Sequence, residues 1–345
     1  MNPETAEKAK LMKKNHKVII ATRGSKLALW QAEWVKAELE RRYPDIRIEL
    51  KKIKTTGDKI LDVPLAKVGG KGLFVKEIEE SLLRKDADLA VHSMKDVPVD
   101  LPEGLHIAAV CNREDPRDAF ITKIQGFRGQ GFKDLPHGAK VGTSSLRRAC
   151  QLLNIRPDLN ITQLRGNLDT RIRKLDEGQF DAIIVAAAGV KRLGLVQRIT
   201  ETLGADISLP AIGQGAVGIE CRINDEFINK MLEPLNHPET AVCVCAERAF
   251  LRKLEGGCQV PIAGHARLEN RSQNTEHRQK KVCSLGSGLC VLIIDGLVGS
   301  ISGDRIIKDS IEGNPDKAEQ LGTKLAEMLI SKGAGKILAE VYNRK

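Results

Sequence analysis

The sequence is poor in aromatic side chains and has no long apolar run. Aromatic residues make up 3% of the 345 positions, and none lies in the basic segment 140–174, so an unpaired base would find no ring there on which to stack. No stretch reaches the roughly 20 apolar residues of a membrane-spanning helix. Residues 1–16 are charged and lack the apolar segment of a secretory signal, so we expect a disordered arm there. These absences weigh against nucleic-acid and membrane partners.

The common metal and nucleotide signatures are missing as well. Cys243 and Cys245 stand too close together for the usual zinc pair, and no second CxxC or HxxxH lies nearby. Residues 213–218 match GxGxxG, but a strand-like segment follows them where the dinucleotide motif needs a helix. We expect no metal site and interpret 213–218 as a glycine-rich hinge. Eight scattered cysteines in a chain of this length favour reduced thiols and a cytoplasmic location.

The positive charge is concentrated locally. The net charge is +10, of which residues 1–17 and 271–290 each contribute +3, so the rest of the chain is only weakly basic. Within that remainder, residues 140–174 hold eight Lys and Arg against two Asp. A cluster of this kind fits a binder of small anions better than a binder of nucleic acid.

Short runs rich in β-branched residues alternate with amphipathic stretches through the first two-thirds of the chain. A strand over 17–22 followed by a helix over 26–42 is the clearest example. This alternation is typical of α/β domains with parallel sheets and helices on both faces. The segments around Pro116 and Pro210 are interpreted as crossings between two such domains. A third unit, with a long helix and closing helices, begins near His237.

Polar clusters follow several of the expected strands, where α/β sheets bind their ligands. The segment 142–148, GTSSLRR, offers hydroxyls, backbone N–H groups and two guanidiniums where a strand meets a helix. Arg165 and Arg171 repeat the arrangement one strand later, with Asn167 as the expected N-cap. This pattern predicts an anion site, although solvated helix faces would give the same composition.

Three further segments have a functional interpretation and a plain structural one. Lys67 and Lys71 flank a glycine-rich loop before a helix. Such a loop could bind an anion, or it could be an ordinary solvated loop. Asp96 follows a strand among cations and could stabilise a developing positive charge, or form a structural ion pair. His92 by itself is most readily a core histidine. Cys258 lies in the constrained loop EGGCQVP without a local histidine base, so by itself it is an ordinary cysteine.

Taken together, the motifs resemble those of one family. In order along the chain they are TRGSKLALWQAE, TTGDKILDVPLAKVGGKGLF, AVHSMKDVP, GTSSLRRACQL, LRGNLDTRIRKLD, AIGQGAVGIE, AERAFLRKLEGGCQVPI and LAEVY. This series is similar to that of the porphobilinogen deaminases and covers about residues 17–345.

The resemblance implies an α/β fold of two doubly wound domains, like those of periplasmic binding proteins, and a small α+β C-terminal domain. Domain 1 would comprise 17–113 and 212–236, domain 2 would comprise 114–211, and domain 3 would comprise 237–345. An insertion at 271–290 replaces the tight hairpin turn expected in domain 3, and we expect it to form a disordered surface loop.

The resemblance also implies a transferase of haem biosynthesis. It would condense four porphobilinogen molecules, with loss of ammonia, into the linear tetrapyrrole hydroxymethylbilane. The primer would be a dipyrromethane cofactor joined by a thioether to Cys258, and Asp96 would contact pyrrole N–H groups and stabilise the azafulvenium cation. The enzyme is expected to be monomeric, without an obligate protein partner.

Twelve further positions match those with which the family binds its anionic ligands. The match implies that Lys71, Lys95, Thr143, Ser145, Arg147 and Arg148 bind the cofactor, and that Arg23, Ser25, Lys67, Arg165, Arg171 and Arg192 bind substrate. Two other classes remain as alternatives. A non-enzymatic anion-binding protein of the same two-domain design would need neither Cys258 nor Asp96, and a nucleic-acid binder is favoured only by the basic charge.

Overall fold

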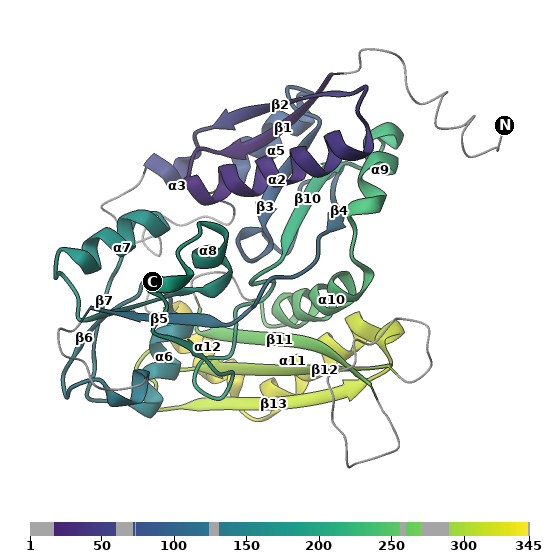
Figure 1. Cartoon of the computed structure of the whole chain (residues 1–345). Helices are drawn as coiled ribbons and strands as arrows, with labels where there is room; N and C mark the ends of the chain where they lie inside the picture. Colours follow the sequence, from purple (N-terminus) through teal and green to yellow (C-terminus); the bar gives the residue numbers. More distant parts are fainter. Residues whose placement is uncertain are drawn as a thin grey trace. The chain divides into compact units, whose positions relative to one another are not determined.

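A computed structural model describes residues 17–59, 72, 74–123, 131–255, 260–270 and 290–343 (Figure 1). The chain divides into two compact units. Unit 1 comprises Met1–Leu61, Gly70–Asn112 and Val217–His237, and unit 2 comprises Asp62–Gly69, Arg113–Ala216 and Pro238–Lys345. The predictions for the N-terminal arm, the Lys67–Lys71 loop and nearly all of the insertion lie outside the described residues. The three domain boundaries drawn from the resemblance stay a prediction.

The described part of unit 1 contains a five-stranded sheet of order β2-β1-β3-β10-β4. Its strands are β1 (Lys17–Arg23), β2 (Arg47–Ile53), β3 (Leu89–Ser93), β4 (Leu105–Val110) and β10 (Val217–Arg222). The inner strands β1, β3 and β10 bury Ile20, Leu89 and Ile219 completely. The chain therefore returns to unit 1 after residue 216, as expected from the crossing near Pro210.

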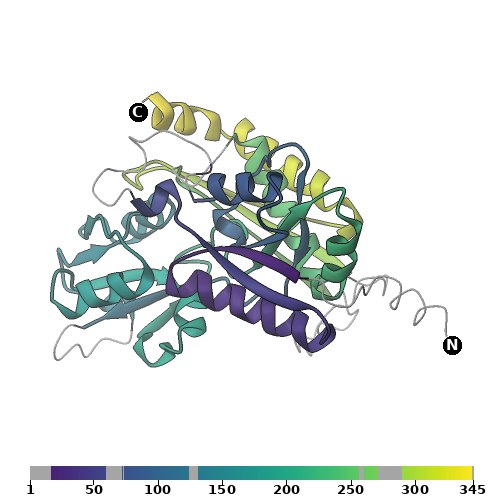
Figure 2. The ribbon, with the colours of Figure 1, turned by 90° about the horizontal axis from the view of Figure 1, so that it is seen from above.

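The described α-helices of unit 1 are α2 (Lys26–Arg42), α3 (Thr56–Lys59), α5 (Lys76–Leu83) and α9 (Glu226–Leu232). Helices α2, α5 and α9 contact strands of this sheet. Figures 1 and 2 both show α2 running beside the sheet, against which it packs through Ala32, Val35 and Leu39. Ser25 begins this helix because its Oγ accepts a hydrogen bond from the Ala28 N–H. The helix predicted over 26–42 is confirmed.

Unit 2 contains a second five-stranded sheet, of order β7-β6-β8-β5-β9, within its described residues. Its strands are β5 (Asp118–Thr122), β6 (Lys140–Gly142), β7 (Asn160–Thr162), β8 (Ala182–Ala186) and β9 (Glu201–Leu203). The α-helices between the strands of this sheet are α6 (Leu146–Ile155), α7 (Leu168–Asp176) and α8 (Ala187–Arg192). Hydrophobic side chains such as Phe120, Val141 and Ile183 are fully buried around the sheet.

Both five-stranded sheets combine the expected parallel pairs with antiparallel ones. In unit 1, β10 runs antiparallel to β3 and β4, and in unit 2, β5 runs antiparallel to β8 and β9. Parallel neighbours need a crossover connection, usually a helix. Strands β5 and β10 instead follow the segments that pass from one unit to the other, and they enter their sheets in the opposite direction.

The C-terminal part of unit 2 is an antiparallel sheet covered by helices. The strands are β11 (Ile262–Asn270), β12 (Cys290–Gly299) and β13 (Ile306–Gly313), and the helices are α10 (Pro238–Lys253), α11 (Ala318–Ser331) and α12 (Ala334–Asn343). The register of β11 and β12 continues to the pair Asn270 and Cys290, so the pairing of these strands persists on both sides of the insertion. The predicted α/β class, with two sheet domains and a small α+β part, is confirmed.

Candidate active site

Four of the predicted site residues lie at one edge of the unit 1 sheet. Strands β1 and β3 are parallel neighbours, so their carboxyl ends meet at the same edge. Arg23 is the last residue of β1 and Ser25 caps α2, while Lys95 and Asp96 form a single-turn 3-10 helix directly after β3. Both Lys95 and Asp96 are half-buried. The structure thus brings together a carboxylate, two cations and a hydroxyl.

Arg23 already has a partner at this edge. Its guanidinium forms an ion pair with Asp58 and stacks over the Phe74 ring at 4.3 Å from the centroid. Asp58 is fixed in turn by the Thr55 hydroxyl, which donates to it at 2.8 Å. Burial alone would raise the pKa of Asp58, but hydrogen bonds from Arg23 and Thr55 lower it. Asp58 therefore stays ionised and orients the guanidinium.

The anion-binding segment of unit 2 joins β6 to α6. Strand β6 is parallel to β7, so Thr143 follows one carboxyl end while Arg165 follows the neighbouring one. The Thr143 Oγ1 accepts from the Ser145 N–H at 3.2 Å, and the Ser145 Oγ accepts from the Arg148 N–H at 3.4 Å. Ser145 is therefore the N-cap of α6, and these bonds set the start of the helix that holds both arginines.

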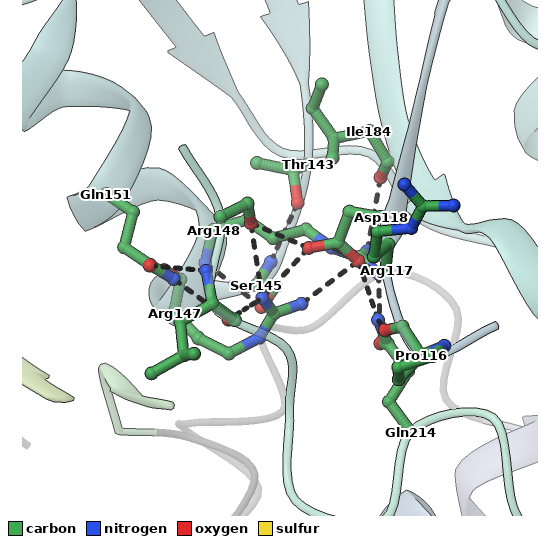
Figure 3. A network of polar contacts seen from close by, with 12 residues as sticks. Pro116, Arg117, Asp118, Thr143, Ser145, Arg147, Arg148, Gln151, Ile184 and Gln214 are labelled. Atoms are coloured by element: carbon green, nitrogen blue, oxygen red, sulfur yellow. Dashed lines mark hydrogen bonds and ion pairs between the residues drawn. The ribbon is translucent and has the colours of Figure 1, made fainter. Parts of the chain in front are cut away.

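Arg147 and Arg148 are buried and share one carboxylate (Figure 3). Asp118, the first residue of β5, is completely buried. Its Oδ2 accepts from Arg147 Nη1 at 2.8 Å, and its Oδ1 accepts from Arg148 Nη2 at 2.7 Å and from Arg148 Nε at 3.0 Å. Ser208 and Gln214 also donate to Asp118, at 2.7 and 2.9 Å. We call these five residues the Asp118 cluster.

The Asp118 cluster has one negative and two positive charges. Burial alone would raise the pKa of Asp118, but the charges of Arg147 and Arg148 outweigh it and hold that pKa far below its ordinary range. Burial lowers the pKa of Arg147, Asp118 opposes this, and the like charge of Arg148 adds to it. A buried site with one positive charge in excess is well suited to receive a carboxylate.

Arg165, Arg171 and Arg192 are half-buried at other positions of unit 2. Arg171 Nε donates to the Gly166 carbonyl at 2.8 Å, and Arg192, at the end of α8, donates to the Gly215 carbonyl at 2.7 Å. Asn167 occupies the N-cap position of α7 but makes no side-chain cap hydrogen bond. Backbone carbonyls thus hold the guanidiniums of Arg171 and Arg192 in place.

His92 is a buried residue of β3 with an acidic neighbour. Its Nε2 lies 2.9 Å from Oε2 of the fully buried Glu220 on β10, although the two atoms are not aligned as a hydrogen bond. Glu79 of α5 is also buried. Burial and the charge of Glu220 raise the pKa of Glu79 to about 7, against an opposing effect of His92. His92 is thus in the core, as its plain interpretation predicted, but in a titratable cluster.

The GxGxxG match is a turn that leads into a strand. Residues 213–216 precede β10, and no helix follows, so the nucleotide interpretation fails. Gly213 and Gly215 have φ of +68° and +91°, and a Cβ on Gly215 would collide with the Glu114 carbonyl. Glycine is therefore required at this turn between the two units of the chain.

Lys67, Lys71 and Cys258 lie outside the described residues, so their predicted roles stay predictions. Of the six cysteines that the structure describes, Cys111, Cys150, Cys221, Cys243 and Cys245 are free thiols, whereas Cys290 is disulfide-bonded. In the same part of the chain, no group of three or more His, Cys, Asp or Glu side chains is placed to hold a metal ion. No helix there is long and apolar enough to cross a membrane.

Two site residues were missed in the sequence. Asp118 was included only in a crossing segment, and Asp58 only in a quoted motif. The sequence signal for Asp118 is an acid directly before an apolar strand segment. In DAFIT, residues 118–122, Asp118 is followed by three buried apolar residues. A charge at such a position needs a partner of opposite sign.

Two solved structures are similar to this chain at low sequence identity. The VFT2 domain of Bordetella pertussis BvgS is 15% identical, covers 67% of this chain and 90% of its own, and has a TM-score of 0.38. A nutrient-binding protein from Burkholderia cenocepacia, bound to methionine, is 14% identical over 65% of this chain and 93% of its own, with a TM-score of 0.40.

Comparisons of the sequence with known families find much higher similarity. Residues 18–230 match the family model "Porphobilinogen deaminase, dipyromethane cofactor binding domain", and residues 241–331 match "Porphobilinogen deaminase, C-terminal domain". The porphobilinogen deaminase of Geobacter sulfurreducens is 55% identical over 94% of this chain and 95% of its own. That of Pelobacter propionicus is 53% identical over 94% and 97%. The resemblance seen in the sequence is confirmed, the two other classes are not supported, and the chain belongs to the porphobilinogen deaminase family of enzymes.

Proposed function

We propose that this chain condenses four porphobilinogen molecules, with release of ammonia, into hydroxymethylbilane on a dipyrromethane primer held through the Cys258 sulfur. When bound, the primer supplies the pyrrole carbon to which each new ring is joined. The single observation that best supports the proposal is the charge of the Asp118 cluster. A dipyrromethane carries several carboxylates, and the cluster offers one buried positive charge in excess.

The residues of unit 1 would act on the incoming substrate. Asp96, half-buried after β3, accepts hydrogen bonds from pyrrole N–H groups and stabilises the positive charge that develops as ammonia leaves. Arg23 binds a substrate carboxylate while Asp58 holds its guanidinium in place. Ser25, the N-cap of α2, would bind substrate as well, and so would Lys67, which belongs to unit 2.

The residues of unit 2 would bind the remaining carboxylates. Thr143, Ser145, Arg147 and Arg148, together with Lys71 and Lys95 of unit 1, bind the cofactor. Arg165, Arg171 and Arg192 bind substrate. Support comes from the backbone contacts that orient two of these side chains: Arg171 donates to the Gly166 carbonyl and Arg192 donates to the Gly215 carbonyl.

The test is the intact mass of the purified protein after incubation with porphobilinogen, compared with Cys258→Ser. We expect a gain of two linked pyrrole units on the wild-type protein and none on the variant. A well-folded wild-type protein without an adduct would overturn the proposal. A matched comparison with Asp96→Asn separates attachment from turnover, because this variant should lose most of its rate of hydroxymethylbilane release, on the order of 10² to 10⁴-fold.

We further propose that the enzyme works in the cytoplasm as a monomer, without an obligate protein partner and without nucleic acid. The five free thiols among the described cysteines are typical of a reducing compartment, whereas the disulfide at Cys290 is not. Cell fractionation and light scattering of the purified protein test these points. Recovery in a membrane or secreted fraction, or a stable dimer, would contradict them.

A further inference from the structure

We infer that Asp118 is a positioning residue: it presets the guanidiniums of Arg147 and Arg148 for a carboxylate of the dipyrromethane cofactor. This inference rests on the proposed function, because it takes these arginines as cofactor ligands. Asp118 itself is completely buried, so it would act on the cofactor only through the arginines. Its role is therefore to fix where two positive charges point.

The hydrogen bonds of Asp118 fix the plane of each guanidinium. Arg147 is bound through both terminal nitrogens, Nη1 to Oδ2 at 2.8 Å and Nη2 to Oδ1 at 3.2 Å. Arg148 is bound through Nε and Nη2, both to Oδ1. A two-point contact restricts rotation about the end of each side chain. The cofactor would then meet donors that are already oriented, so less conformational entropy is lost on binding.

Asp118 is itself held rigidly. It is paired with Ala186 of β8 on one side and with Leu203 of β9 on the other. Gln214 Nε2 donates both to Asp118 and to the Pro116 carbonyl, the latter at 2.6 Å (Figure 3). The Asp118 carboxylate is therefore fixed by the sheet, and its hydrogen bonds fix the two arginines of α6 relative to that sheet.

The other partners of the arginines are neutral. Arg147 donates to the Leu209 carbonyl at 2.7 Å, and Arg148 donates to the Ile184 carbonyl at 3.1 Å. Within the described ranges, the ion pairs of both arginines are made with Asp118. Neutral dipoles stabilise a guanidinium without cancelling its charge, so the excess positive charge is left for an anionic ligand.

The experiment measures the rate at which cofactor-free protein acquires two pyrrole units from porphobilinogen, followed by intact mass. We expect Asp118→Asn to slow attachment on the order of 10²-fold, because the arginines keep their charge but lose their orientation. Glu247→Gln is the matched control. Glu247 is an equally buried carboxylate of unit 2, paired with Arg113. This control should lose stability but attach the cofactor at nearly the wild-type rate.

Attachment at the wild-type rate in folded Asp118→Asn would overturn the inference and leave the proposed function intact, whereas no adduct on wild-type protein would overturn the proposed function itself. Should Asp118→Asn not fold, the double variant Asp118→Asn/Arg148→Gln keeps the net charge of the cluster. If Asp118 positions Arg147, the double variant attaches the cofactor more slowly than Arg148→Gln alone. Equal rates would overturn the inference.

Discussion

Two carboxylates are completely buried in the part of unit 2 that the structure describes, and they differ in how their charge is balanced. Glu247 of α10 pairs with one guanidinium, that of Arg113, at 2.6 and 3.2 Å, and also accepts from the N–H groups of Gly213 and Ala266. The His265 Nδ1 lies 3.4 Å from its Oε1. Asp118 pairs with two guanidiniums. We call the first set the Glu247 cluster. Arg113 balances the charge of the Glu247 carboxylate, with the His265 imidazole beside it, whereas the Asp118 cluster retains a positive charge. This difference separates a structural centre from one prepared for an anion.

One residue joins the two clusters. The Gln214 backbone carbonyl accepts from Arg113 Nε at 2.8 Å, while its side chain donates to Asp118. Gln214 lies between Gly213 and Gly215, whose positive φ angles shape the turn. The segment interpreted from its glycines as a hinge is thus the connection between a balanced cluster and an unbalanced one.

The largest expected effect tests the balance of the Glu247 cluster. Arg113→Gln leaves the Glu247 carboxylate buried without its guanidinium, so we expect the free energy of unfolding to fall by about 3–5 kcal/mol. Urea denaturation of cofactor-free protein, in a Cys258→Ser background, measures this loss.

Arg148→Gln is the matched comparison for Arg113→Gln, because it removes one of two arginines and leaves Asp118 paired with Arg147. The remaining pair is balanced, so the expected loss is smaller, about 1–3 kcal/mol for the hydrogen-bond partners left behind. Equal losses in the two variants would show that the two clusters do not differ in charge balance.

Much of the frame of these clusters could be predicted from the sequence. The helix over 26–42, the N-cap Ser145 and the two arginines at the start of α6 follow from periodicity and capping, which are local properties. Asp118 could not be assigned to them because it lies 29 and 30 residues away along the chain. Its strand, β5, enters the sheet antiparallel after a crossing, and only the register of β5 with β8 places it beside α6.

The counter-ion of Arg147 and Arg148 likewise comes from a distant part of the chain. Residues 140–174 appear strongly basic because the acid that pairs with two of their arginines comes from β5. Likewise, Asp58 reaches Arg23 from 35 residues away. Pairing across a sheet is set by topology, which local composition does not encode.

The stability contributed by a buried acid without an arginine partner should depend on pH in the opposite sense to that of Glu247. Glu79 in unit 1 tests this expectation. Burial first, and then the charge of Glu220, raise its pKa from 4.5 to about 7, so the folded state favours the protonated form. The contribution of Glu79 to stability is therefore present below its ordinary pKa and is lost as pH rises from 4.5 towards 7. For Glu247, burial would raise the pKa, but Arg113 and His265 together outweigh it and lower the pKa to about 2, so its contribution is lost as pH falls from 4.5 towards 2.

The measurement is urea unfolding of wild type and Glu79→Gln across the window from 4.5 to 7. We expect the variant to gain stability relative to wild type as pH rises, because it has no carboxyl to ionise. Parallel pH profiles would contradict the assignment. Glu80, a half-buried neighbour on the same helix that pairs with Arg84 at 3.6 Å, provides the control substitution Glu80→Gln.

The smallest expected effect separates charge from geometry within the Asp118 cluster. The Ser208 hydroxyl donates to Asp118 Oδ2 at 2.7 Å and is fully buried, but it has no charge. Ser208→Ala should therefore lower the free energy of unfolding by only about 1 kcal/mol, since Arg147 still occupies the same oxygen. Cofactor attachment, followed by intact mass, should proceed at the wild-type rate because both two-point contacts to the arginines remain. If Ser208→Ala instead slowed attachment as much as Asp118→Asn, a change in the orientation of the carboxylate alone would be enough to slow cofactor binding. The excess positive charge would then not explain the role of the Asp118 cluster by itself.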